Sequence, residues 1–171
     1  MGQFVTFVLD DARFGIDVFY TREINDRTGF TPVPGARPFV AGVMNLRGEI
    51  VTMIDLRLRL GLPARAAGAA SINLVLKTQD EVAALDVGAA QRLAVGNERM
   101  GFVIDTVGDI VTVADDAIEP LPAVDEDRYD LAFIRGVVPG AGDLWMVLDV
   151  ERLVNHGFRA EARRGTGSVP T

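Results

Sequence analysis

Short apolar runs alternate with turn residues along most of the chain. Residues 4–9 and 14–18 form two such runs, and the polar segment 10–13 between them predicts a hairpin. Residues 50–54 and 144–148 are apolar at successive positions, which is typical of strands covered on both faces. Further strands are expected through Val43 and over residues 72–76, 81–87, 93–95 and 100–104. The pattern therefore predicts a mainly β protein.

Two short helices are expected, each directly after an aspartate that ends an apolar strand. Residues 56–61 follow Asp55 and residues 150–157 follow Asp149, and both runs close with a glycine. The apolar residues of the second run have helical spacing, whereas the first run alternates. The first helix is therefore predicted mostly from its counterpart.

The strongest internal signal is a duplication. Residues 39–56 align without a gap over residues 133–150 at an offset of 94, and a Phe, two Gly, one Val and the final Asp are identical. A second alignment, at an offset of 86, places residues 7–16 over 93–102 and the pair Glu23-Ile24 over Asp109-Ile110. Two blocks in the same order predict two homologous β-rich halves.

Composition excludes several classes of chemistry. The 171 residues include 17 basic and 24 acidic side chains, no cysteine and a single histidine, His156. Disulfides and thiolate nucleophiles are therefore excluded, and the two serines do not lie in the motif of a serine hydrolase. The net charge of −7 argues against nucleic-acid binding, and no apolar stretch is long enough to span a membrane.

Paired acidic residues suggest sites that have simpler structural explanations. Asp55 and Asp149 occupy equivalent places and could form a two-carboxylate site like that of an aspartic protease, but no D-[ST]-G motif follows either one. Capping of the two helices is the favoured interpretation. Asp125, Asp127 and Asp130 lack the glycine and the distal glutamate of a calcium loop. We expect no metal site and no cofactor.

Arg47 distinguishes the two halves. It lies beside Gly48 at the tip of a predicted hairpin, and its counterpart in the second half is Ala141. Gly48 and its counterpart Gly142 suit a bulged hairpin, which needs a positive φ. A specialised use of the arginine in one half and an ordinary turn arginine remain open as alternatives.

Residues 39–57 carry a motif that resembles the CheW family, the coupling proteins of bacterial chemotaxis. Its most specific part is the Asn45-Leu46-Arg47-Gly48 turn, followed by an aliphatic strand and Asp55-Leu56-Arg57. The segments 3–7, 14–18, 33–39, 101–111 and 133–137 also resemble the family, so the resemblance covers nearly the whole chain up to about Phe158.

The resemblance implies two pseudo-symmetric, five-stranded, SH3-like β-barrel subdomains with short helices. It places a single domain over residues 1–158, with a first subdomain at roughly 10–65 and a second at roughly 70–150. The N-terminal strand and the C-terminal helix could be shared between them. The small residues of segment 63–70 predict a linker, and residues 159–171 predict a disordered tail.

The resemblance also implies a function without catalysis. Members join the cytoplasmic tip of transmembrane chemoreceptors to the regulatory domain of the histidine kinase CheA, so the expected location is cytoplasmic, at membrane receptor arrays. The positions matched to receptor binding are Glu23, Gly42, Arg47, Val107, Ile110 and Gly136. Apolar side chains would bury a receptor helix, and charges at the rim would fix its register. Plain barrel core is the alternative for Val107 and Ile110.

Two departures from the family pattern suggest specialisation. Thr52 stands where the family usually has proline, which restores a backbone donor and could alter an edge. Segment 77–90 is longer than usual and could extend a hairpin or cover an edge that faces the kinase. The alternative functions are a scaffold of another, pilus-type chemosensory pathway, a domain for some other helical partner, and a β-barrel hydrolase that uses Asp55 and Asp149.

Overall fold

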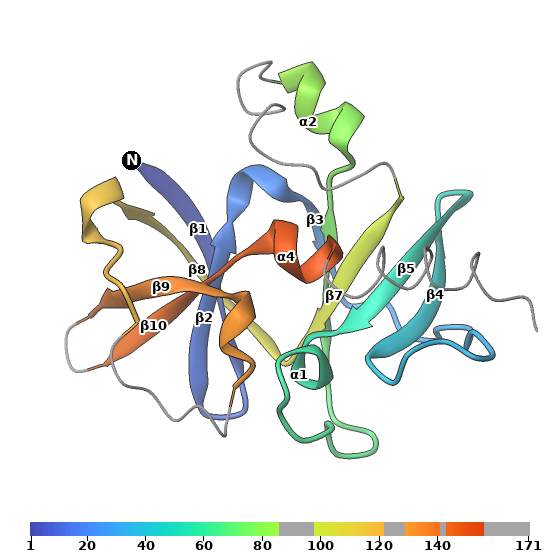
Figure 1. Cartoon of the computed structure of the whole chain (residues 1–171). Helices are drawn as coiled ribbons and strands as arrows, with labels where there is room; N and C mark the ends of the chain where they lie inside the picture. Colours follow the sequence, from blue (N-terminus) through green and yellow to red (C-terminus); the bar gives the residue numbers. More distant parts are fainter. Residues whose placement is uncertain (86–97, 122–128, 141–142, 156–171) are drawn as a thin grey trace, which may run out of the picture.

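Two five-stranded sheets make up the fold (Figure 1). The computed structural model describes residues 1–85, 98–121, 129–140 and 143–155. Sheet A has the strand order β8-β1-β2-β10-β9, and sheet B has the order β3-β6-β7-β5-β4. The prediction of a mainly β fold with two five-stranded units and short helices is confirmed.

The elements are short and closely spaced along the chain. Sheet A contains β1 (Gly2–Leu9), β2 (Ala12–Asp17), β8 (Thr106–Val113), β9 (Ile134–Pro139) and β10 (Leu144–Leu148). Sheet B contains β3 (Thr21–Asn25), β4 (Val40–Leu46), β5 (Glu49–Asp55), β6 (Ile72–Leu76) and β7 (Met100–Ile104). The helices are η1 (Val18–Tyr20), α1 (Leu56–Arg59), α2 (Gln79–Leu85), η2 (Asp115–Ala117), η3 (Leu131–Phe133) and α4 (Val150–Asn155).

One predicted strand is wrong. Residues 81–85 belong to helix α2, whose first turn carries a capping box between Thr78 and Glu81. The Glu81 carboxylate accepts from the Thr78 N–H, and the Thr78 hydroxyl accepts from the Glu81 N–H, so the orphan donors of the helix start are satisfied. The predicted strand at 93–95, the predicted tail at 159–171, His156, Asp125, Asp127 and Gly142 lie outside the described residues.

The hairpin that carries Arg47 is tighter than predicted. Leu46 pairs directly with Glu49, so Arg47 and Gly48 form a two-residue loop without a bulge. Both loop residues have positive φ, 51° for Arg47 and 83° for Gly48. This is the twist that two-residue hairpins prefer. The Asn45 side chain stabilises the loop by accepting from the Gly48 N–H at 2.9 Å.

The strand pairings reproduce the duplication. Phe14 of β2 pairs in parallel with Met146 of β10, and Met100 of β7 pairs in parallel with Thr52 of β5. These four residues are related by the two offsets found in the sequence, 86 and 94. The strand orders of sheets A and B are therefore equivalent, element for element.

Each sheet combines strands from both halves of the chain. Sheet A holds the first two strands of the first half and the last three of the second, and sheet B holds the reverse. The predicted subdomain limits, roughly 10–65 and 70–150, therefore do not describe the sheets. The first strand of the second half is β6, because Leu74 faces Ile24 as Val5 faces Ile110. Residues 77–99 are then an insertion between two strands that a two-residue turn joins in the first half.

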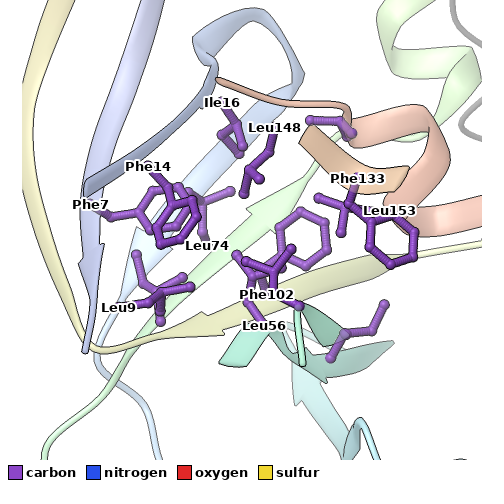
Figure 2. Close-up of a cluster of buried hydrophobic side chains, with 14 of the residues drawn as sticks. Phe7, Leu9, Phe14, Ile16, Leu56, Leu74, Phe102, Phe133, Leu148 and Leu153 are labelled. Carbon is purple, nitrogen blue, oxygen red and sulfur yellow. The ribbon is translucent and has the colours of Figure 1, made fainter. Parts of the chain in front are cut away.

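The main core draws side chains from both sheets. Figure 2 shows Phe7, Phe14 and Ile16 of sheet A facing the same cluster as Leu74 and Phe102 of sheet B. Residues of α1, η3 and α4 complete it. Each sheet also has a smaller cluster of its own, around Met53 in sheet B and around Trp145 in sheet A. The large shared core makes the two sheets one packing unit.

A buried arginine joins the two halves where they meet. The Arg59 guanidinium lies 4.3 Å from the ring centre of Phe39 and 4.5 Å from that of Phe133, which are equivalent residues at the offset of 94. It also donates to the Leu153 carbonyl of α4 at 3.2 Å. Burial lowers the pKa of Arg59, and the aromatic faces and the carbonyl compensate its charge.

Candidate functional site

Glu23 and Arg47 come from opposite sides of sheet B and form an ion pair. Glu23 lies on the edge strand β3, and Arg47 lies at the tip of the β4–β5 hairpin. Most of the Glu23 side chain is covered, whereas 57% of the Arg47 side chain is exposed. The pair presents a fixed cation at the rim of sheet B. The sequence predicted both residues but not their contact, because they are separated by the whole β3–β4 connection.

Four further charged residues, two of them adjacent in the chain to the segments of this pair, form an alternating ring. Arg22 of β3 contacts Glu49 of β5 at 3.1 Å and Glu81 of α2 at 3.5 Å. Arg99 contacts the same two carboxylates, Glu49 at 2.9 Å and Glu81 at 2.8 Å. Arg22 precedes Glu23 in the chain and Glu49 follows the Arg47–Gly48 loop. The ring therefore ties together the segments that carry the Glu23–Arg47 pair.

Val107 and Ile110 lie on β8, an edge strand of sheet A. Residues 106–110 are all exposed, with Val107 at 40% and Ile110 at 59%. This exposure excludes the alternative of plain barrel core for both residues. The ladder to β1 is bulged between Val107 and Ile110, and the Thr6 hydroxyl donates to the Asp109 carbonyl there at 2.7 Å. A bulged edge resists addition of another strand, so apolar side chains and not free backbone groups are its main means of contact.

Exposed apolar side chains are repeated in the two halves. Ile24 and Ile110 are equivalent at the offset of 86, and Ile50 and Leu144 are equivalent at the offset of 94. All four belong to the large apolar side chains that are more than a third exposed. Core packing cannot explain why both copies keep an apolar group in water. Apolar groups that are exposed in both copies are candidates for a contact surface.

Gly42 and Gly136 act through the backbone. A Cβ on Gly42 would lie 2.6 Å from the Thr31 carbonyl oxygen, and a Cβ on Gly136 would lie 2.6 Å from that of Glu119. In each half the covering segment forms a two-bond bridge to the residue after the glycine, Thr31 to Val43 and Glu119 to Val137. Both glycines are therefore needed for the close approach of a covering segment.

The six predicted receptor-binding residues occupy separate places. Glu23 and Arg47 touch each other on sheet B, and Val107 and Ile110 share one strand of sheet A. Gly42 lies on the edge strand β4 of sheet B, and Gly136 on the edge strand β9 of sheet A. In Figure 1, the β4–β5 hairpin and β8 lie on opposite sides of the molecule. The four positions that are at least partly exposed therefore lie in two places, Glu23 and Arg47 on sheet B and Val107 and Ile110 on sheet A, whereas Gly42 and Gly136 are buried.

Asp105 is the most heavily bonded carboxylate of the described chain, and sequence analysis gave it no role. It stands where β7 of sheet B continues into β8 of sheet A. It accepts from Arg57 Nε at 2.9 Å, from Arg65 Nη2 at 2.7 Å and from the Asp10 N–H at 3.0 Å. Segment 63–70, predicted as a featureless linker, is thus anchored by Arg65. Nothing in the sequence Asp55-Leu56-Arg57 predicts that Arg57 contacts Asp105.

The pKa of Asp105 falls although its burial acts in the opposite direction. Burial raises the pKa of the carboxyl, but the Arg57 guanidinium, the Asp10 N–H and Arg65 outweigh it and lower the value from 3.8 to about 2. The carboxylate is therefore ionised at neutral pH and holds Arg57, Arg65 and the β1–β2 turn at one junction.

Asp55 and Asp149 each bond to the helix that follows. The Asp55 carboxylate accepts from the Arg57 N–H at 3.0 Å, and the Asp149 carboxylate accepts from the Arg152 N–H at 3.1 Å. Asp55 also lies 3.6 Å from Arg65. Each carboxylate is committed to its own helix start, which gives no support to a shared hydrolytic site.

Loss of a cap has a measurable cost. Replacing Asp149 by Ala is expected to lower the free energy of unfolding by about 1 kcal/mol, because the first turn of α4 loses its acceptor. Urea unfolding measures the change. The Asp149→Asn variant keeps an acceptor oxygen and serves as the control, with a loss below about 0.5 kcal/mol. Equal losses in the two variants would contradict the capping role.

No group of three or more His, Asp or Glu side chains within the described residues is placed to hold a metal ion. A depression of about 510 Å³ is lined by Asp17, Asp115, Asp149 and Glu151 together with Arg135 and apolar groups. No described helix is long and apolar enough to cross a membrane. The described surface features that suit binding are the charged hairpin tip at Arg47 and the exposed apolar side chains of the strands.

Comparisons with known proteins identify the family and the fold of the chain. The family model described as "CheW-like domain" matches residues 3–158. The chain belongs to the CheW family. It is 28% identical to the chemotaxis protein CheW of Rhizobium meliloti (strain 1021) over 149 residues, which cover 87% of this chain and 84% of that protein. It is 30% identical to the chemotaxis protein CheW of Treponema pallidum over 151 residues, which cover 88% of this chain and 81% of that protein.

A solved structure shows the same fold. The crystal structure of the scaffolding protein TtCheW from Thermoanaerobacter tengcongensis matches with a TM-score of 0.71 and 23% sequence identity, over 91% of this chain and 94% of that one. CheW-family proteins are non-catalytic scaffold or coupling proteins of chemotaxis, and this chain is therefore no enzyme, as the sequence predicts.

Proposed function

We propose that this CheW-family protein couples the cytoplasmic tip of transmembrane chemoreceptors to the regulatory domain of the histidine kinase CheA. It would act in the cytoplasm, at membrane receptor arrays. The observation that carries the proposal is the Glu23–Arg47 pair, which presents a positioned cation at the rim of sheet B. Family membership supplies the chemotaxis context.

The exposed apolar strands supply the second element of recognition. Val107 and Ile110 on β8 offer apolar area to a helical receptor tip, and the bulge in β8 disfavours strand addition. Burial of apolar groups would give affinity, and the charge of Arg47 would select the partner and its register. Ile24, the counterpart of Ile110, and Ile50 are exposed on sheet B and leave a further surface for the kinase.

Charge reversal at Arg47 tests the proposal. Arg47→Glu places two carboxylates side by side at the hairpin tip, and we expect receptor-tip binding to weaken by about tenfold or more, with unchanged melting. Binding of a purified cytoplasmic receptor fragment, followed by ternary assembly with the kinase and its autophosphorylation, measures the effect. The matched control is Arg135→Glu on β9, an exposed cation of the other sheet. Normal kinase recruitment by Arg47→Glu would refute the role of this residue.

A further inference from the structure

The insertion between β6 and β7 contributes helix α2, whose Glu81 is linked by ion pairs to the two segments that carry Glu23 and Arg47. In the first half, two residues, Asp10 and Asp11, connect the equivalent strands. In the second half, residues 77–99 connect them, and their described part begins with helix α2. Val82 of α2 is fully buried, and Glu81 reaches the ring of charges around Glu49. Helix α2, in the described part of the insertion, is therefore anchored to sheet B through the contact of Glu81 with Arg22 of β3.

The second sheet provides an internal comparison for this ring. Arg13 and Asp143 are the counterparts of Arg99 and Glu49 at the two offsets. Their ion pair is open, at 4.0 Å, and both side chains are exposed, whereas Arg99 and Glu49 lie 2.9 Å apart and are more covered. The counterpart of Arg22 is Gly108, which has no charge. A simple pair in sheet A has thus become a four-residue ring in sheet B, and α2 supplies one of the added charges.

Thr52 connects to the same ring. Its N–H donates to the Arg99 carbonyl at 2.9 Å, which a proline at this position could not do. β5 is an interior strand of sheet B, so the substitution fixes Arg99 and does not alter an edge. The two departures noted in the sequence, Thr52 and the long insertion, therefore meet at one residue.

The electrostatics of Glu81 fit a structural anion. Burial raises the pKa of its carboxyl, but the Thr78 N–H and the cations Arg22 and Arg99 outweigh burial and leave the pKa below its ordinary value. Glu81 is therefore charged at neutral pH. Because Arg22 and Arg99 both also bind Glu49, one carboxylate of α2 restrains β3 and the β4–β5 hairpin together.

We propose that α2 is a brace that positions Arg47 for partner recognition, with Glu81 and Arg99 as positioning residues. The ring restrains Arg22, which precedes Glu23 in the chain, and Glu49, which follows the Arg47–Gly48 loop. Arg47 then loses less freedom when a partner binds, which raises affinity without a contact from α2 itself. The inference rests on the proposed function, since the partner is the receptor tip.

A double-mutant cycle on receptor binding tests the brace. Glu81→Gln keeps the capping box but removes the charge from the ring. We expect it to weaken binding of the purified receptor fragment by about three- to fivefold in the wild-type background and by less than about 1.5-fold in the Arg47→Ala background. Equal effects in the two backgrounds, or no effect in the wild type, would overturn the inference. Unfolding curves of all four proteins check that the fold is retained.

A second measurement needs no partner. Hydrogen exchange at the Gly48 amide, which donates to Asn45, reports the opening of the hairpin tip. Glu81→Gln is expected to speed this exchange several-fold, whereas the matched change Asp143→Asn in sheet A leaves it unchanged. Unchanged exchange in Glu81→Gln would refute the brace. If the wild type binds no receptor fragment, the proposed function fails, and the exchange experiment still decides whether α2 restrains the hairpin.

Discussion

Replacing Asp105 by Asn is expected to lower the free energy of unfolding by about 2 to 3 kcal/mol at neutral pH. The side chain is largely covered and holds Arg57, Arg65 and the Asp10 N–H at the junction of the two sheets. Asn keeps the shape but removes the charge that both arginines share, so Arg57 and Arg65 retain longer carboxylate contacts, to Asp10 at 3.7 Å and to Asp55 at 3.6 Å. Asp109→Asn, four residues further along the chain and exposed on β8, is the matched control, with a change below about 0.5 kcal/mol.

Acid should remove the same stabilisation from the wild type. The pKa of Asp105 in the folded protein is about 2, below its ordinary value of 3.8, so folding favours the ionised form. The contribution is complete above about pH 5 and is lost as the pH falls from about 4 to about 2. Urea unfolding at pH 7, 4 and 2.5 measures it: the difference between wild type and Asp105→Asn should shrink with decreasing pH. A constant difference would show that ionisation of Asp105 is not its source.

Replacing either paired glycine by alanine is expected to cost about 3 kcal/mol. In Gly42→Ala the methyl group meets the Thr31 carbonyl, and Gly42 also has a φ of 148°, which side chains disfavour. In Gly136→Ala the methyl group meets the Glu119 carbonyl and the Ile118 side chain. Each change must displace a covering segment that two backbone hydrogen bonds hold in place.

Urea unfolding together with receptor binding separates this structural effect from a contact. Gly68→Asn is the control, because nothing lies near the site of its Cβ and asparagine tolerates a positive φ, so the loss should stay below about 1 kcal/mol. If Gly42→Ala abolished receptor binding at unchanged stability, the glycine would be a direct contact position and its role as a packing site would be wrong.

The sequence predicts what is encoded locally. The hairpins, the interior strands β6, β7 and β10 and the duplication all follow from spacing within short windows, and the structure has them. The strand predicted at 81–87 is wrong, because Val82 and Leu85 also have helical spacing and residues 81–85 belong to α2. The capping box of Thr78 and Glu81 was the available signal for the helix.

The remaining features depend on distant residues. Asp105 contacts Arg57, Arg65 and Asp10 only when the two sheets are packed together. No pattern of neighbouring residues predicts these contacts. The exchange of strands between the halves cannot be predicted from the sequence either. A strand shows the same alternation of apolar residues whichever of the two sheets it joins. In the candidate site, the family resemblance identified Arg47 in the turn and Glu23 in the Glu23-Ile24 pair, but their contact and the neighbouring ring of charges required the structure.

The exchange of strands also constrains how the chain acquires its structure. Sheet B lies within residues 21–104, so all its strands exist before the last third of the chain is made. Sheet A joins β2 to β10, Phe14 to Met146, and therefore cannot be completed until β10 has been synthesised. Pairings over such sequence distances slow folding, because the entropy of closing the long loop is lost before the strand contacts can stabilise it. The β1–β2 hairpin, which precedes every strand of sheet B in the chain, is thus among the last elements to be covered.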